Sequence, residues 1–138
     1  MSSSGASGTH SRIRSDHATE LAEDYVEAIA EIAESSGLCR AVDLSRHFGV
    51  SHVTVSKAIG RLVRDGYATT EPYGPIALTS KGQRVAKAAK ARHEIVYQFL
   101  LALGVSEKTA QTDSEGLEHH VSQETLKAMQ DFMEKEEG

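Results

Sequence analysis

The chain lacks pairs of cysteines and long apolar runs, and each of these absences argues against a class of protein. Among 138 residues there is a single cysteine, no tryptophan and an aromatic share of 5%. One cysteine cannot form a disulfide within the chain, which fits a reducing compartment, and we expect Cys39 to be a small packed side chain. No apolar run is long enough to span a bilayer or to form the core of a signal peptide. We therefore expect a cytoplasmic protein without a membrane partner.

The net charge of −5 argues against nucleic-acid binding until it is divided along the chain. Residues 1–36 carry two basic and seven acidic side chains (−5), and residues 86–138 carry six and ten (−4). Residues 37–85 carry seven basic and three acidic side chains (+4). The basic middle segment is the part expected to meet DNA. The acidic flanks are compatible with a cation site and equally with solvated helix surfaces.

The spacing of apolar residues predicts a mainly α-helical chain. Residues 1–14 are rich in serine and glycine, lack periodicity, and are expected to form a disordered N-terminal arm. Two short β-prone runs, 67–71 and 76–79, surround a Pro/Gly turn and predict a hairpin. Helices are predicted over residues 16–35, 40–48, 52–65, 80–103, 106–119 and 123–136.

The predicted helices over 40–48 and 52–65 have the pattern of a helix-turn-helix. Gly49 between them permits a left-handed turn, and Ser51 is a good N-cap for the second helix. The second helix has a basic outer face, and the hairpin that follows it would be the wing of a winged helix. Base edges are usually met near the N-terminus of the recognition helix, and phosphates by basic side chains around it. The expected DNA contacts are Ser51, His52, Thr54 and Lys57 for base readout, and Arg61, Arg64 and Lys81 for phosphates.

Two groups of acidic residues have a spacing that suits a metal ion. If the C-terminal group is helical, Glu115, Glu118 and His119 lie on one face, one turn apart. The pair Asp24 and Glu27 repeats the carboxylate spacing near the N-terminus, and His93 lies between the two groups. Oxygen and imidazole donors suit manganese or iron(II), whereas zinc and copper(I) favour thiolates. Amphipathic helices also carry such residues without a metal, so spacing alone leaves both interpretations open.

Together these features resemble the manganese-responsive repressors of the diphtheria toxin repressor family. The resemblance runs from about Asp24 to about Met133, and Arg92-His93 combined with the segment from Glu115 to His120 is its most specific part. It implies a homodimer in which each chain has two domains. These are a winged helix-turn-helix DNA-binding domain, residues 15–85, and an α-helical metal-binding and dimerisation domain, residues 86–138.

The resemblance also implies two metal ions per chain, bound between the domains. By position, one ion would be held by Asp24, Glu115, Glu118 and His119, and the other by Glu27, His93, Glu115 and Glu118. In the iron-responsive branch of the family, a methionine stands at position 24 and a cysteine at position 115. Both positions here are oxygen donors, which favours manganese(II).

The resulting prediction is a manganese(II)-activated repressor that binds a double-stranded DNA operator as a homodimer and regulates manganese uptake genes. No organic cofactor is implied. One alternative is an iron(II)-responsive regulator of the same fold, because manganese is the weakest binder in the divalent series. Another is a metal-independent winged-helix repressor. A two-metal site could also hydrolyse phosphates, but we find no additional nucleophile or phosphate-binding glycine loop, so we predict that the protein is not an enzyme.

Overall fold

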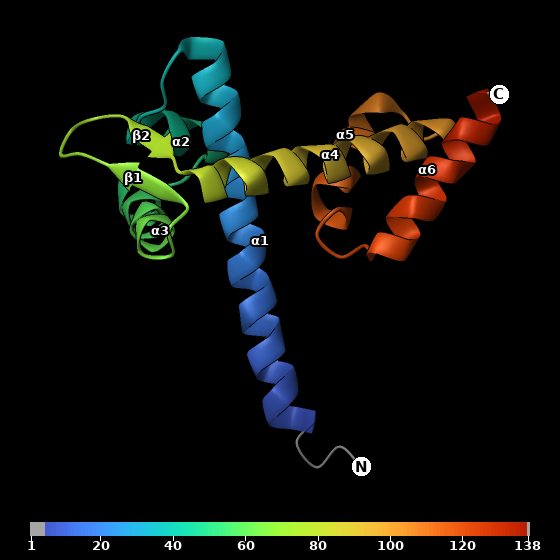
Figure 1. Ribbon diagram of the computed structural model, residues 1–138, viewed down its shortest axis with the longest axis horizontal. Helices are drawn as coiled ribbons and strands as arrows, with labels where there is room; N and C mark the ends of the chain where they lie inside the picture. Colours follow the sequence, from blue (N-terminus) through green and yellow to red (C-terminus); the bar gives the residue numbers. More distant parts are fainter. Residues whose placement is uncertain (1–4, 138) are drawn as a thin grey trace. The chain divides into compact units, whose positions relative to one another are not determined.

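The computed structural model describes the backbone of residues 5–137 and the side chains of residues 19–136. The chain divides into two compact units, residues 1–86 and residues 87–138, with the boundary inside helix α4 (Figure 1). The described residues are mostly helical, which confirms the predicted fold class. The elements are α1 (Gly5–Ser36), α2 (Ala41–Phe48), α3 (His52–Arg64), β1 (Ala68–Thr70), β2 (Ile76–Leu78), α4 (Ser80–Ala102), α5 (Glu107–Leu117) and α6 (Gln123–Glu137).

Helix α1 is longer than the helix predicted over 16–35. It begins at Gly5, inside the segment for which we predicted disorder, and ends at Ser36 before Gly37, whose φ is +90°. Forming the first turn is the costly step in helix formation, so weak helix formers can extend a helix that packing has already fixed. The prediction for residues 1–4 falls outside the described residues.

One face of α1 packs into the core of the first unit. Tyr25, Val26 and Ile29 are buried, and the Tyr25 ring stacks on Phe48 of α2 with a centroid separation of 4.5 Å. Val26 is completely buried, whereas Leu21, one turn before Tyr25, is 41% exposed. Helix α1 contacts three elements, α2, α3 and β2. These contacts bury a wider part of its surface than the single apolar face of a surface helix.

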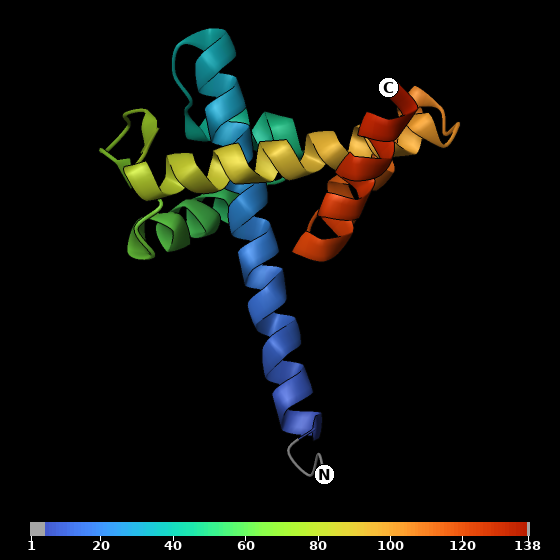
Figure 2. The same ribbon diagram turned by 45° about the vertical axis from the view of Figure 1, so that its right-hand side comes forward.

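Helices α2 and α3 form the predicted helix-turn-helix, seen from a second side in Figure 2. Gly49 joins them in the left-handed conformation, with φ +66° and ψ 38°. The Ser51 side chain caps α3, because its Oγ accepts a hydrogen bond from the Thr54 N–H at 3.2 Å. Both features of the turn were predicted from the residue types and are confirmed.

Two valines of this motif are partly exposed. Val42 of α2 is 42% exposed and Val63 of α3 is 40% exposed. At 3.6 residues per turn, Val42 points away from the buried Leu44, two residues later. Val63 lies at the edge of the buried face of α3, which consists of Val55, Ala58, Ile59 and Leu62.

The predicted wing is a short antiparallel hairpin in which Ala68 pairs with Leu78 and Thr70 with Ile76. The segment before α2 adds a further pairing, because the Ile76 N–H donates to the Cys39 carbonyl at 2.8 Å. This pairing ties the hairpin to the end of α1. It also explains why Cys39 is completely buried, as we predicted for a packed side chain.

We expect Cys39 to be chemically inert in the folded protein. Burial, reinforced by the neighbouring Asp43 carboxylate, raises the pKa of the Cys39 thiol to about 11. The thiolate is the reactive form, so only about one thiol in a thousand is ionised at pH 8. The rate at which iodoacetamide alkylates Cys39, measured by mass spectrometry, should rise about tenfold per pH unit from pH 7 to 9. The rate in the folded protein should be far lower than the rate in the urea-unfolded chain. Native alkylation as fast as that of the unfolded chain would contradict this assignment.

The second unit consists of the C-terminal part of α4 with α5 and α6, which lie beside it in Figure 2. Val96, Ala110 and Leu126 are buried, and the Phe99 ring meets Phe132 edge-on at 5.6 Å. The side chains of Ser106 and Ser122 accept hydrogen bonds from backbone N–H groups three residues later and cap α5 and α6. Among the described residues, no helix combines the length and the apolar content that crossing a membrane requires.

Candidate functional site

The end of α5 determines where the predicted C-terminal ligands lie. The helix ends at Leu117, and Glu118, His119 and His120 form a turn. The N–H groups of His119 and His120 donate to carbonyls three residues back, at 3.4 and 3.0 Å, which is the tighter 3₁₀ pattern. Gly116, a weak helix former, precedes this turn. The expectation that α5 continues through His119 is therefore wrong.

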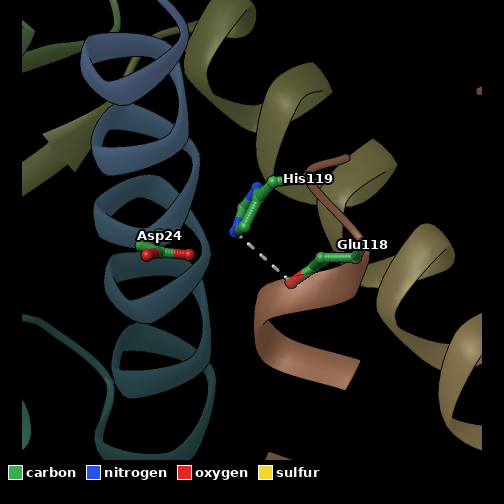
Figure 3. A group of neighbouring side chains, drawn as sticks. All are labelled: Asp24, Glu118 and His119. Carbon is green, nitrogen blue, oxygen red and sulfur yellow. Dashed lines mark ion pairs between the residues drawn. The ribbon is translucent and has the colours of Figure 1, made fainter. Parts of the chain in front are cut away.

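The turn buries two of the predicted ligands and leaves a third exposed. The side chains of Glu118 and His119 are 1% and 2% exposed, whereas Glu115, on the last turn of α5, is exposed. Figure 3 shows Glu118 and His119 with the ion pair between them. The Glu118 N–H still donates to the Ser114 carbonyl at 3.1 Å, four residues back, so the tighter pattern begins only at His119.

Glu118 is the centre of a group of donors within the second unit. Its Oε1 lies 3.5 Å from His93 Nδ1 and 3.8 Å from His119 Nε2. Two donors bound to one ion at about 2.2 Å lie roughly 3–4 Å apart, so each histidine is close enough to Glu118 for the pair to bind an ion together. Among the described residues, the buried Glu118 Oε2 has no hydrogen-bond partner. An unsatisfied buried carboxylate oxygen is costly, and a divalent cation would compensate it.

Two polar residues of α5 that the sequence analysis missed lie beside His93. Gln111 Nε2 is 3.3 Å from His93 Nε2 and donates to Glu115 Oε1 at 3.3 Å. Ser114 is fully buried, and its Oγ is 3.5 Å from His93 Nε2. Gln111, Ser114 and Glu115 are spaced i, i+3 and i+4, so the helical spacing around Glu115 could have identified them.

The remaining predicted ligands belong to the first unit. Asp24 and Glu27 lie one turn apart on α1, and both are partly buried; Figure 3 draws Asp24 on that helix. Asp24, Glu118 and His119 offer carboxylate oxygens and an imidazole nitrogen. Donor atoms of these types suit a hard or borderline divalent ion. The second unit thus brings His93 and His119 together around Glu118, and Gln111 connects His93 to Glu115.

The predicted DNA-contact residues of α3 are accessible. His52, Thr54, Lys57 and Arg61 are all exposed. Ser51 is exposed too, but its hydroxyl is engaged with Thr54, both with the backbone N–H and with Oγ1 at 3.1 Å. Ser51 therefore stabilises the start of the recognition helix, and base readout would have to share its hydroxyl with this cap.

Two of the predicted phosphate contacts have intramolecular partners at the end of α3. Lys81 Nζ donates to the Asp65 carbonyl at 2.9 Å and lies 4.4 Å from the centroid of the Tyr67 ring. Arg64 Nε donates to Asp65 Oδ1 at 3.2 Å. A cation at a helix C-terminus interacts favourably with the helix dipole, so Lys81 stabilises the junction between α3 and the wing.

Comparison with known proteins assigns the chain to a family. Residues 17–76 match the family model described as iron dependent repressor, N-terminal DNA binding domain. Residues 79–137 match its metal binding and dimerisation domain. The transcriptional regulator MntR of Escherichia coli O6:H1 is 43% identical over 124 residues, which cover 90% of this chain and 80% of that protein. The chain belongs to the iron-dependent repressor family. The HTH-type transcriptional regulator MntR of Bacillus subtilis is 35% identical over 116 residues, 84% of this chain and 82% of that one.

Membership in the iron-dependent repressor family confirms the resemblance stated from the sequence. It also confirms the predicted class of function, a metal-dependent DNA-binding repressor with a DNA-binding and a dimerisation domain. A solved structure described as a manganese-dependent transcriptional repressor complex with manganese is similar, with a TM-score of 0.71 and 31% identity. The similarity covers 78% of this chain and 50% of that chain, so this chain spans about half the length of that structure.

Proposed function

We propose that the protein is a manganese(II)-activated repressor that binds a double-stranded DNA operator as a homodimer in the cytoplasm. The observation that carries the proposal is the buried Oε2 of Glu118, which lacks a hydrogen-bond partner among the described residues, in the metal-binding domain of a metal-dependent repressor family. The similarity to regulators named MntR and to a manganese complex supports manganese as the ion. Manganese uptake genes are the proposed targets.

Two ions per chain are proposed, with the ligand sets that the family resemblance implies. Asp24, Glu115, Glu118 and His119 would hold one ion, and Glu27, His93, Glu115 and Glu118 the other. The ions supply positive charge that offsets the shared carboxylates. Oxygen donors at positions 24 and 115 favour manganese(II) over softer metals.

In this proposal the ligands control the DNA-binding geometry. Without an ion, the carboxylates would repel one another, whereas Asp24 and Glu27 holding an ion would tie α1 to the second unit. Across a homodimer this connection would set the separation of the two recognition helices near one DNA turn, about 34–36 Å. The shift toward this state is limited by the difference in metal affinity between the two states.

DNA contact is proposed for the exposed face of α3. His52, Thr54 and Lys57 would contact base edges, with Ser51 holding the start of the helix, and Arg61 would contact phosphates together with Arg64 and Lys81. Each phosphate contact releases counterions, so the operator affinity should fall as salt rises. A groove of about 750 Å³ between α4 and α6, with apolar side chains such as Ile95, Leu101 and Met133 along it, supports a dimer surface in the second unit.

An anaerobic titration with manganese(II), with free metal followed by electron paramagnetic resonance, tests the proposal. We expect the full chain to bind two ions, and Asp24→Ala to lose the ion that Asp24 helps to hold. Iron(II) activating DNA binding at lower free concentration than manganese(II) would favour the iron-responsive alternative. No saturable binding of either ion would leave a metal-independent winged-helix repressor.

A further inference from the structure

We propose that Ser114 is a positioning residue for His93, and that its hydroxyl fixes which ring nitrogen of His93 is offered to a metal ion. The inference rests on the proposed function, because it takes His93 as a ligand. Ser114 lies outside both proposed ligand sets, and only the ion held by His93 would depend on it.

The two nitrogens of the His93 ring face different groups. Nδ1 lies 3.5 Å from Glu118 Oε1, a proposed ligand of the same ion. Nε2 points to α5, where Ser114 Oγ is at 3.5 Å and Gln111 Nε2 at 3.3 Å. A neutral histidine that binds a metal through one nitrogen carries its proton on the other, and the group that accepts this proton fixes the orientation of the ring. With Nδ1 bound to the ion, Nε2–H therefore needs an acceptor.

Ser114 is better suited than Gln111 to be that acceptor. The Gln111 Nε2 amide group donates to the Glu115 carboxylate, which only accepts, so this arrangement presents a donor rather than an acceptor to His93. The Ser114 hydroxyl donates to the Gln111 carbonyl at 3.1 Å, which leaves its oxygen lone pairs available to the ring. Hydrogen bonds of this kind are often long without ligand and shorten once it is bound.

Burial makes the hydroxyl of Ser114 effective in this role. The residue is 0% exposed, so water does not compete for His93 Nε2 on that side. Its backbone carbonyl accepts from the Glu118 N–H at 3.1 Å, which couples the position of Ser114 to that of the central carboxylate. Alanine at this position keeps the backbone bond and removes only the hydroxyl.

The proposal assigns Ser114 to one of the two ions. His93 belongs to the ligand set with Glu27, and His119 to the set with Asp24. Loss of the hydroxyl should weaken the first of these ions by roughly 10- to 100-fold, the usual effect of removing a partner of a ligating histidine. The ion held by His119 should keep its affinity within a factor of about three.

The test is a manganese(II) titration of the full chain as wild type, Ser114→Ala, His93→Ala and the double variant. We expect Ser114→Ala to weaken one ion, His93→Ala to remove it, and Ser114→Ala to add no further loss when His93 is already absent. Cadmium(II)-loaded protein, which is diamagnetic, gives a second measurement by nitrogen NMR. A protected His93 Nε2–H signal is expected in wild type and should exchange rapidly in Ser114→Ala.

Three results would overturn the inference, and they can be told apart. If His93→Ala removes an ion but Ser114→Ala leaves both affinities unchanged, Ser114 does not position His93 and the proposed function stands. If Ser114→Ala weakens binding equally with and without His93, the hydroxyl acts by another route. If His93→Ala retains both ions, the proposed ligand set itself is wrong and the inference falls with it.

Discussion

Replacing Glu118 with glutamine should weaken manganese(II) binding at both proposed metal sites by more than about 100-fold. Glutamine preserves the shape of the side chain but removes its charge and one of its two acceptor oxygens. The residue is 2% exposed and its Oε1 faces both His93 and His119, so no other described side chain takes its central place. Loss of an outer partner of a ligand costs up to about 100-fold, and loss of a shared ligand should cost more.

The titration that measures this effect needs a matched control. Glu107→Gln makes the same chemical change at an exposed carboxylate on the first turn of α5 and should leave both affinities unchanged. Circular dichroism of the metal-free variants would verify that each remains folded. Binding by Glu118→Gln within threefold of wild type would mean that the carboxylate is not a metal ligand.

Gly82→Ala should destabilise the fold by about 3 kcal/mol or more. Gly82 is buried in the first turn of α4, where an added Cβ would lie 2.0 Å from the Tyr67 carbonyl oxygen and 3.2 Å from Leu78 Cδ2. The peptide group of Tyr67 cannot easily move away from the added Cβ, because hydrogen bonds hold it at both its N–H and its carbonyl oxygen. Its N–H donates to the Leu62 carbonyl at 2.8 Å, and its oxygen accepts from the Thr79 N–H at 3.0 Å.

Gly60→Ala is the matched control for this substitution. Gly60 lies inside α3, is exposed, and has no atom within 4 Å of an added Cβ. Alanine should therefore stabilise the helix by roughly 0.5–1 kcal/mol. Urea unfolding of the metal-free protein measures both changes. Equal free energies of unfolding for Gly82→Ala and wild type would show that the junction between the wing and α4 is looser than described.

Local signals in the sequence were sufficient to predict the DNA-binding motif. Gly49 and Ser51 specify a left-handed turn and a helix cap through their own backbone and side-chain chemistry, and both are found as expected. The end of α5 was not predictable in the same way. Glu118 and His119 continue the helical spacing, but the chain tightens into a 3₁₀ turn and buries them against their surroundings. That outcome depends on tertiary packing.

The sequence analysis named the charged residues of the candidate metal site. It did not name the polar residues that lie beside His93. The spacing of the carboxylates and histidines left two interpretations open, and the family resemblance favoured the metal site. Ser114 and Gln111 are ordinary polar residues of a helix, and only their proximity to His93 distinguishes them. The contact of Lys81 with Asp65 was missed for the same reason, since the two residues are distant in sequence.

If the metal controls DNA binding, the affinity for operator DNA should depend on manganese(II). Genomic fragments of the source organism would be selected on the full-length protein with manganese(II). Their affinity would then be measured by fluorescence anisotropy with the metal and with a chelator. We predict binding at least about 100-fold tighter with manganese(II), which corresponds to about 2.7 kcal/mol, and no metal response in Glu118→Gln. Equal affinity with and without the metal would show that manganese(II) does not control DNA binding.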